Sequence, residues 1–131
     1  MANVWLIGLE RKDAAEIARV ASAAHHAVFD RLPGIDTREL GDAGIVFVGG
    51  APRVQQSLLR RIRGAYPTLP VVAVLETVRV GDMLDALEAG ATDYCWTPIG
   101  WRPIQRFMEL MATRLVELRI GRKSRTAGAS S

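Results

Sequence analysis

Three short runs of almost uninterrupted apolar residues limit the folds open to this chain of 131 residues. They cover residues 3–9 (NVWLIGL), 44–48 (GIVFV) and 71–75 (VVAVL). A strand with one face in water alternates apolar and polar residues, whereas a strand covered on both faces is apolar throughout. The runs therefore predict central strands of a parallel sheet, with helices packed on both sides.

The segments between these runs predict helices and two further strands. Residues 27–32 are followed by Pro33-Gly34 and residues 93–96 by Thr97-Pro98, so each segment is expected to be a short strand. The expected helices cover residues 13–24, a short stub at 37–42, a segment that begins near Pro52, residues 80–89, and a segment from 101 or 102 to about 120. Five strands that alternate with five helices indicate an α/β domain with right-handed crossovers.

Helical spacing assigns an inner face to each predicted helix. Asp13, with Glu16 three residues later, is typical of a capping box and is expected to begin the first helix. Gly90 follows the last periodic residue of the fourth helix and is expected to end it. The residues expected to face inward are Ala14, Ile17, Val20, Ala21 and Ala24 in the first helix, Val54, Leu58, Leu59 and Ile62 in the third (Gln55, Arg60, Arg61 and Arg63 outward), and Met83, Leu84, Ala86 and Leu87 in the fourth.

Composition excludes a membrane-spanning or disulfide-bonded protein. Apolar residues make up 49% of the chain and charged residues 24%, as in globular domains. No run approaches the roughly 20 apolar residues of a membrane span, and the first residues do not form an export signal. The single cysteine, Cys95, cannot form an internal disulfide and is expected in the core, which favours the cytoplasm.

The net charge of +3 comes from the end of the chain. Arg119, Arg122, Lys123 and Arg125 contribute +4 after Leu118, where there is no acid, so subtraction leaves −1 for residues 1–118. We therefore expect one domain over residues 1–120 and a basic, flexible linker or tail over 121–131. Such a tail can also bind nucleic acid, which gives a third functional hypothesis beside the two below.

Two segments resemble one known family. Residues 58–76 (LLRRIRGAYPTLPVVAVLE) and 86–99 (ALEAGATDYCWTPI) are similar to segments of the receiver domain of bacterial two-component response regulators. The resemblance covers about residues 3–118. It implies a flavodoxin-like (CheY-like) doubly wound sheet of five parallel strands in the order 2-1-3-4-5, with five helices.

The same resemblance implies that the phosphoryl-transfer residues are missing. Receivers have two acids after the first strand for Mg²⁺, a phosphoacceptor Asp after the third, a Ser or Thr after the fourth and a Lys after the fifth. Carboxylates bind the cation, the Asp attacks the phosphoryl group, and the Lys neutralises its charge. The matching positions here are Gly8 and Leu9, Gly49, Leu75, and Thr97. The resemblance therefore implies an atypical, phosphorylation-independent receiver that is not an enzyme and needs no Mg²⁺ or other cofactor.

Other residues near the same strand ends leave an alternative open. Gly8, Gly49 and Gly50 would expose bare backbone to a phosphate or nucleotide, so a small-ligand domain that uses the vacated pocket is the runner-up. The usual glycine-rich phosphate motifs are absent, however. Glu10 and Glu76 lie at the same rim, but without a nearby histidine they are not expected to perform acid–base chemistry.

The face formed by the fourth helix, fifth strand and fifth helix is expected to bind a protein partner or a second copy, as it commonly does in receivers. Tyr94 matches the family's switch aromatic, and Trp96 and Trp101 flank the Thr97-Pro98 turn, whose peptide bond is often cis in the family. Apolar residues recur in the last helix at spacings of four and three, namely Ile104, Met108, Met111, Leu115 and Leu118, and Phe107 and Leu110 widen this stripe. One stripe is enough to pack a helix on a sheet, so the wider face leaves two interpretations open: a second partner, or core packing alone. The expected interaction surface comprises Tyr94, Trp96, Trp101, Phe107, Leu110 and Arg114.

Together these observations predict the regulatory domain of a longer signalling protein, at its N-terminus. Its partners would be proteins, nucleic acid would be contacted only through an output domain, and no membrane is expected.

Overall fold

The computed structural model describes residues 2–113 as a single α/β domain. The strands are β1 (Asn3–Ile7), β2 (Ala27–Arg31), β3 (Ala43–Val48), β4 (Val71–Leu75) and β5 (Asp93–Trp96). All neighbouring strands are parallel, and their order is β2-β1-β3-β4-β5, which confirms the predicted sheet.

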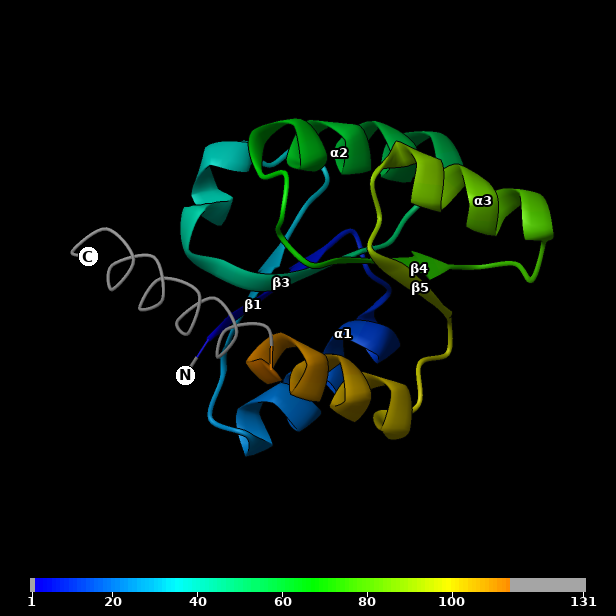
Figure 1. The fold of residues 1–131 in the computed structure, drawn as a ribbon. Coiled ribbons are helices and arrows are strands. Elements are labelled where there is room, and N and C mark those ends of the chain that lie inside the picture. Colours follow the sequence, from blue (N-terminus) through cyan, green and yellow to red (C-terminus); the bar gives the residue numbers. More distant parts are fainter. Residues whose placement is uncertain (1, 114–131) are drawn as a thin grey trace, which may run out of the picture.

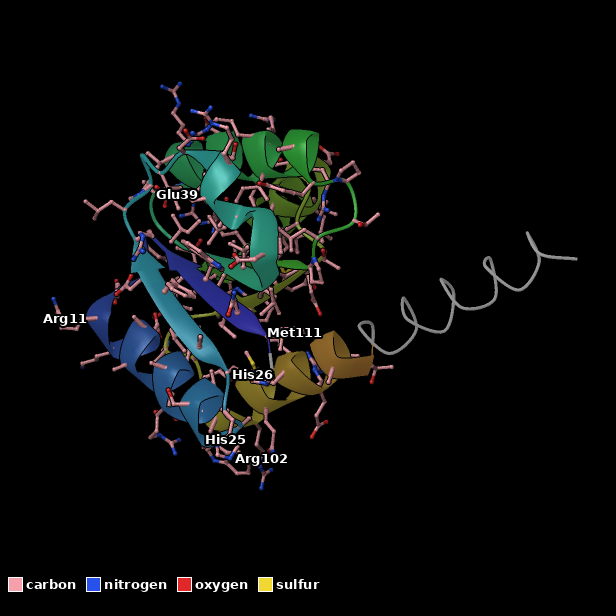
Figure 2. The ribbon with its side chains drawn as sticks, turned by 90° about the vertical axis from the view of Figure 1, so that its left-hand side faces the viewer. Arg11, His25, His26, Glu39, Arg102 and Met111 are labelled. Atoms are coloured by element: carbon pink, nitrogen blue, oxygen red, sulfur yellow. The ribbon has the colours of Figure 1, made fainter. Side chains whose placement is uncertain are left out.

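Helices cover both faces of this sheet (Figure 1). They are α1 (Arg11–Ala23), the 3₁₀ helix η1 (Thr37–Asp42), α2 (Pro52–Ala65), α3 (Val80–Ala89) and a helix over residues 101–113, called the 101–113 helix below. α1 and the 101–113 helix lie on one face, and η1, α2 and α3 on the other. Figure 2 views the sheet from its β2 edge, with α1, which begins at Arg11, on one side and Glu39 of η1 on the other; His25 and His26 lie in the turn between α1 and β2.

Each face has its own apolar core, because successive residues of a strand point to opposite sides of the sheet. Val4 and Leu6 of β1 belong to the core beneath α1 and the 101–113 helix, and Trp5 and Ile7 to the core beneath α2 and α3. The strands of the interior are thus buried on both faces, which is why their sequences are apolar throughout.

The start of α1 differs from the prediction. The helix begins at Arg11 after Glu10, and Asp13 is not its cap but a buried residue inside the first turn. Asp13, Ile17 and Ala21 are spaced four residues apart and are all buried, so Asp13 lies on the inner face. Its carboxylate accepts hydrogen bonds from the turn that follows β5.

The predicted inner face of α2 was wrong at two adjacent positions. Val54 is 46% exposed, whereas Gln55 is only 3% exposed. The Gln55 side-chain amide Nε2 donates to the carbonyl oxygens of Val48 (2.9 Å) and Val74 (3.0 Å), so it joins the ends of β3 and β4. A buried amide is stable where it is hydrogen-bonded in this way.

The outer face of α3 also differs from the prediction. The buried residues of this helix are Ala86 and Ala89, while Leu84 and Leu87 are exposed. Met83 packs against the core as predicted, and the two small alanines allow α3 to lie close to the sheet. Gly90 ends the helix as predicted, and its carbonyl oxygen accepts from Arg63 Nε (2.9 Å) and Nη2 (2.7 Å).

Within residues 2–113, no helix is long and apolar enough to cross a membrane. The predicted tail and the predicted apolar positions Leu115 and Leu118 lie outside the described residues.

Candidate functional site

The candidate site lies at the carboxyl edge of the sheet, where ligands bind in open α/β sheets. Gly8 follows β1, Gly49 follows β3, and Thr97 follows β5. Backbone hydrogen bonds hold adjacent ends together: Gly49 N donates to Ile7 O (2.9 Å), and Thr97 N donates to Leu75 O (2.9 Å). The strand-end positions that the resemblance singled out are therefore assembled at one edge.

The position that would carry the phosphoacceptor is closed by its neighbours. A Cβ on Gly49 would lie 2.7 Å from Leu9 Cδ2 and 2.9 Å from Gly8 O. Both distances are shorter than those between a Cβ and the non-bonded atoms around it in folded proteins. Leu9 also packs against the core beneath α1. The space at the end of β3 thus holds an apolar side chain and leaves no room for a carboxylate.

The remaining residues of this edge supply backbone but no paired acids. Gly8 and Gly50 have φ values of 69° and 100°, a conformation that glycine adopts readily. Leu75 is buried, and Glu76 is exposed, as is Glu10 before α1. Neither glutamate side chain makes a hydrogen bond or an ion pair within residues 2–113, so the structure does not unite them as an acid–base pair.

Thr97, at the position of the receiver lysine, binds a carboxylate that sequence analysis did not assign to the site. Its hydroxyl Oγ1 donates to Asp13 Oδ2, and the Ile99 backbone N donates to Asp13 Oδ1 at 3.0 Å. The peptide bond between Thr97 and Pro98 is cis, as the resemblance implied. Asp13 thus fixes the turn after β5 to α1. The four-residue spacing of Asp13, Ile17 and Ala21 was the signal that could have revealed this.

Cys95 is buried beside this turn and is chemically inert. It is 7% exposed in the core, as predicted. Burial, together with the negative charges of Asp13 and Asp93, raises the pKa of its thiol to about 12. Because the thiolate is the reactive form, Cys95 is no nucleophile at neutral pH. Among residues 2–113 there is also no cluster of three or more His, Cys, Asp or Glu side chains suited to a metal ion.

The predicted interaction surface is only partly assembled. Tyr94 and Trp96 of β5 are half-buried and pack edge to face, with ring centroids 5.4 Å apart. Trp96 Nε1 donates to Thr77 O at 3.1 Å, which links β5 to the segment before α3. Leu110 is exposed on the 101–113 helix, but Phe107 is 2% exposed and belongs to the core. Arg114 lies outside the described residues.

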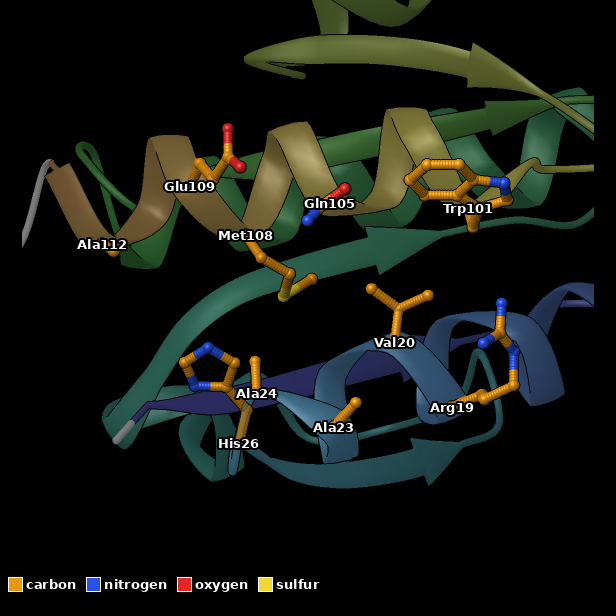
Figure 3. Close-up of a pocket in the computed structure, with 10 residues that line it drawn as sticks. All are labelled: Arg19, Val20, Ala23, Ala24, His26, Trp101, Gln105, Met108, Glu109 and Ala112. Carbon is orange, nitrogen blue, oxygen red and sulfur yellow. The ribbon is translucent and has the colours of Figure 1, made fainter.

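Trp101 lies on a different surface from Tyr94 and Trp96. It is exposed and lines a groove of about 480 Å³ between α1 and the 101–113 helix. Figure 3 shows this groove, with Val20 and His26 on one wall and Met108 on the other. Trp96 and Trp101 therefore do not belong to one interaction surface. Further large apolar residues are exposed in and before α3, namely Val78, Val80, Leu84 and Leu87.

Comparison with known proteins agrees with this architecture. No protein-family profile matches the sequence, and no curated protein matches it significantly. Solved structures do match, among them a CheY-like protein, TadZ, from Pseudomonas aeruginosa (TM-score 0.72, 18% identity, 85% of this chain and 93% of that one) and the BeF₃-activated receiver domain of DrrB (0.74, 17%, 86% and 98%).

NtrX from Brucella abortus in complex with ADP also matches (0.72, 18%), over 92% of this chain but only 29% of the NtrX chain. This chain thus spans less than a third of that relative. The similar structures are consistently response-regulator receivers, and at these identities they establish the fold. The chain has the receiver fold.

Proposed function

We propose that the chain is an atypical receiver that acts in signal transduction by contact with a protein, without phosphorylation. It is not an enzyme in this proposal, and it requires neither Mg²⁺ nor another cofactor. The cytoplasm is the proposed location, since the lone cysteine is a buried thiol.

The observation that carries this proposal is the contact between Leu9 and Gly49. Phosphoryl transfer to a receiver needs a carboxylate nucleophile and cationic groups that stabilise the charge on the phosphoryl oxygens. Here a side chain at position 49 has no space, and the Thr97 hydroxyl is already bound to Asp13. The same contact weighs against the small-ligand alternative, because Leu9 fills space that such a ligand would need.

Exposed apolar residues of α3 support a role in protein contact. Soluble domains rarely gather large exposed apolar side chains in one place unless the place binds something. Val80, Leu84 and Leu87 follow one another at spacings of four and three on the outer face of this helix. Tyr94 and Trp96 on β5 and Leu110 on the 101–113 helix complete the proposed surface.

Mass spectrometry of the intact chain after incubation with acetyl phosphate and Mg²⁺ tests the phosphorylation claim. We expect no adduct, whereas a receiver with an acceptor aspartate, treated in parallel, gains about 80 Da, the mass of one phosphoryl group. An acid-stable or hydroxylamine-sensitive adduct on this chain would contradict the proposal. Thermal-shift measurements with ATP and ADP test the ligand alternative, since a bound ligand raises the melting temperature.

A further inference from the structure

The two helices on one face of the sheet carry opposite charge. α2 contains four arginines, at positions 53, 60, 61 and 63, and no acid, while α3 contains Asp82, Asp85 and Glu88 and no basic residue. The helices lie side by side (Figure 1). A surface formed by a basic helix and an acidic helix side by side is complementary in charge to the same surface on a second copy of the chain.

The charges at the outer surface of these helices are not paired within the domain. Arg53 and Arg60 on α2, and Asp85 and Glu88 on α3, are exposed, and their side chains form no ion pair or hydrogen bond with any other residue in the range 2–113. Arg61 differs, because its guanidinium donates to Pro33 O and Ile35 O. Two cations and two anions are thus left facing water on one surface.

The same surface has an apolar centre. Val80, Leu84 and Leu87 are 66%, 54% and 39% exposed on α3. On α2, Arg53, Ser57, Arg60 and Gly64 follow one another at spacings of four, three and four, so small residues alternate with arginines along its outer face. Arginine stems can cover leucine side chains while their guanidinium groups reach an acid beyond.

We propose that this α2–α3 surface binds a second copy of the same chain. A two-fold axis that runs between the two helices places α3 of each copy over α2 of the other, so that one contact is made twice. Asp85 and Glu88 then face the partner's Arg53 and Arg60, and Leu84 packs on the aliphatic stem of Arg60. This inference rests on the proposed function as a protein-contact module, and it names the partner and the surface.

Charge reversal on each helix tests the interface by sedimentation velocity. We expect the wild-type chain to form dimers whose dissociation constant rises with salt, since exposed charges are screened. Two double variants, Asp85→Lys/Glu88→Lys and Arg53→Glu/Arg60→Glu, should each dissociate at least about tenfold more readily, because like charges then oppose one another. Mixed in equal amounts, the two variants should form a heterodimer, which also shows that both are folded.

A matched control reverses two arginines elsewhere. Arg102→Glu/Arg106→Glu on the 101–113 helix changes the net charge equally and should leave the dimer intact. A wild-type chain that is monomeric at all concentrations, or variants that dimerise like the wild type, would overturn the inference. Dissociation by Leu110→Glu but not by the α2 variants would place the dimer on the β5 side. That result would retain the proposed function, which the acetyl phosphate and thermal-shift experiments test independently of the dimer.

Discussion

At the scale of single residues, Leu9 and Asp13 decide what the carboxyl edge of the sheet can do. Leu9 fills the space beside Gly49 with a methyl group where receivers place charged ligands. Asp13 retains a carboxylate but directs it at Thr97 Oγ1 and Ile99 N, so both of its oxygens accept a hydrogen bond inside the protein. The space beside Gly49 is therefore occupied by Leu9, and both oxygens of the Asp13 carboxylate hold the turn after β5.

Substitution of Gly49 tests the apolar closure of the edge. Gly49→Ala should lower the free energy of unfolding by about 1–3 kcal/mol, because the new Cβ overlaps Leu9 Cδ2 and Gly8 O. The measurement is urea denaturation. Gly64→Ala is the control: it has open space within helix α2 and should stabilise the protein by up to about 1 kcal/mol. Equal stability of Gly49→Ala and the wild type would contradict the closed site.

Removal of the Asp13 carboxylate should cost more than removal of one of its donors. Asp13→Ala leaves the Thr97 hydroxyl and the buried Ile99 N–H without their partner, so we expect a loss of about 2–3 kcal/mol. Thr97→Val breaks one of the two bonds and should cost about 1 kcal/mol. Asp85→Ala, at a site that is exposed in the monomer, should change stability by less than about 0.5 kcal/mol at a concentration at which the chain is monomeric. Chemical denaturation that ranks Asp13→Ala with Asp85→Ala would refute the role given to Asp13.

At the scale of the element, α3 is a helix whose apolar residues exceed what its packing needs. The sheet receives Ala86 and Ala89, and the larger side chains of Val80, Leu84 and Leu87 remain outside. Met83 also packs against the core beneath α2 and α3, and the Arg63 guanidinium, by donating to the Gly90 carbonyl oxygen, joins the end of α3 to α2. The outer face of α3 is the feature of this domain most suited to a partner.

The orientation of α3 can be tested by two substitutions on opposite faces. Ala86→Leu should destabilise the domain by about 1–3 kcal/mol, because three added carbon atoms enter the closely packed inner face. Leu84→Ala should change the stability of the monomer by less than about 0.5 kcal/mol, since Leu84 faces water. The measurement is thermal or urea unfolding at a concentration at which the chain is monomeric. The reverse order of effects would restore the face that periodicity predicted.

The sequence predicted the bounds of the helices and strands more accurately than it predicted which side of each helix faces the core. β4, β5, α3 and η1 have the predicted bounds, because glycine, proline or a change of periodicity marks each end. Periodicity predicted the wrong inner residue at positions 54 and 55. The Gln55 amide is buried because it donates to two carbonyl oxygens, on β3 and β4, that come together only in the folded sheet. Periodicity also failed at Leu84 because apolar residues lie on both faces of α3, so spacing alone could not select one. The filled site was equally hidden, since a leucine one residue after a strand carries no local signal of what it contacts.

At the scale of the whole molecule, two cores share a single sheet. Neighbouring residues of β1 point into different cores, so neither core can form while the sheet is absent. The domain should therefore unfold in one cooperative transition. Its two helical layers also leave different surfaces open: the Trp101 groove on one face and the α2–α3 surface on the other.

Probes in the two cores should report the same unfolding midpoint. Cys95 lies in one core and has a pKa of about 12, so thiol labelling near pH 8 should occur only as the protein unfolds. Trp5 lies in the other core, and its fluorescence can be followed in a Trp96→Phe/Trp101→Phe variant. Coincident urea midpoints are the expected result. Labelling of Cys95 well below the Trp5 transition would show that one layer opens separately.

The contact between Leu9 and Gly49 also has an evolutionary consequence. If the chain descends from a phosphorylated receiver, a return to that chemistry cannot proceed one substitution at a time. An aspartate placed at position 49 first meets Leu9, and an acid placed at position 9 first leaves the core short of an apolar side chain without gaining a metal ligand partner at Gly8. Each single substitution lowers the stability of the domain before phosphorylation could be restored, so the loss of the acceptor site is hard to reverse. Selection on such a chain can then improve the surfaces that bind a protein, but it cannot readily restore a phosphoacceptor site.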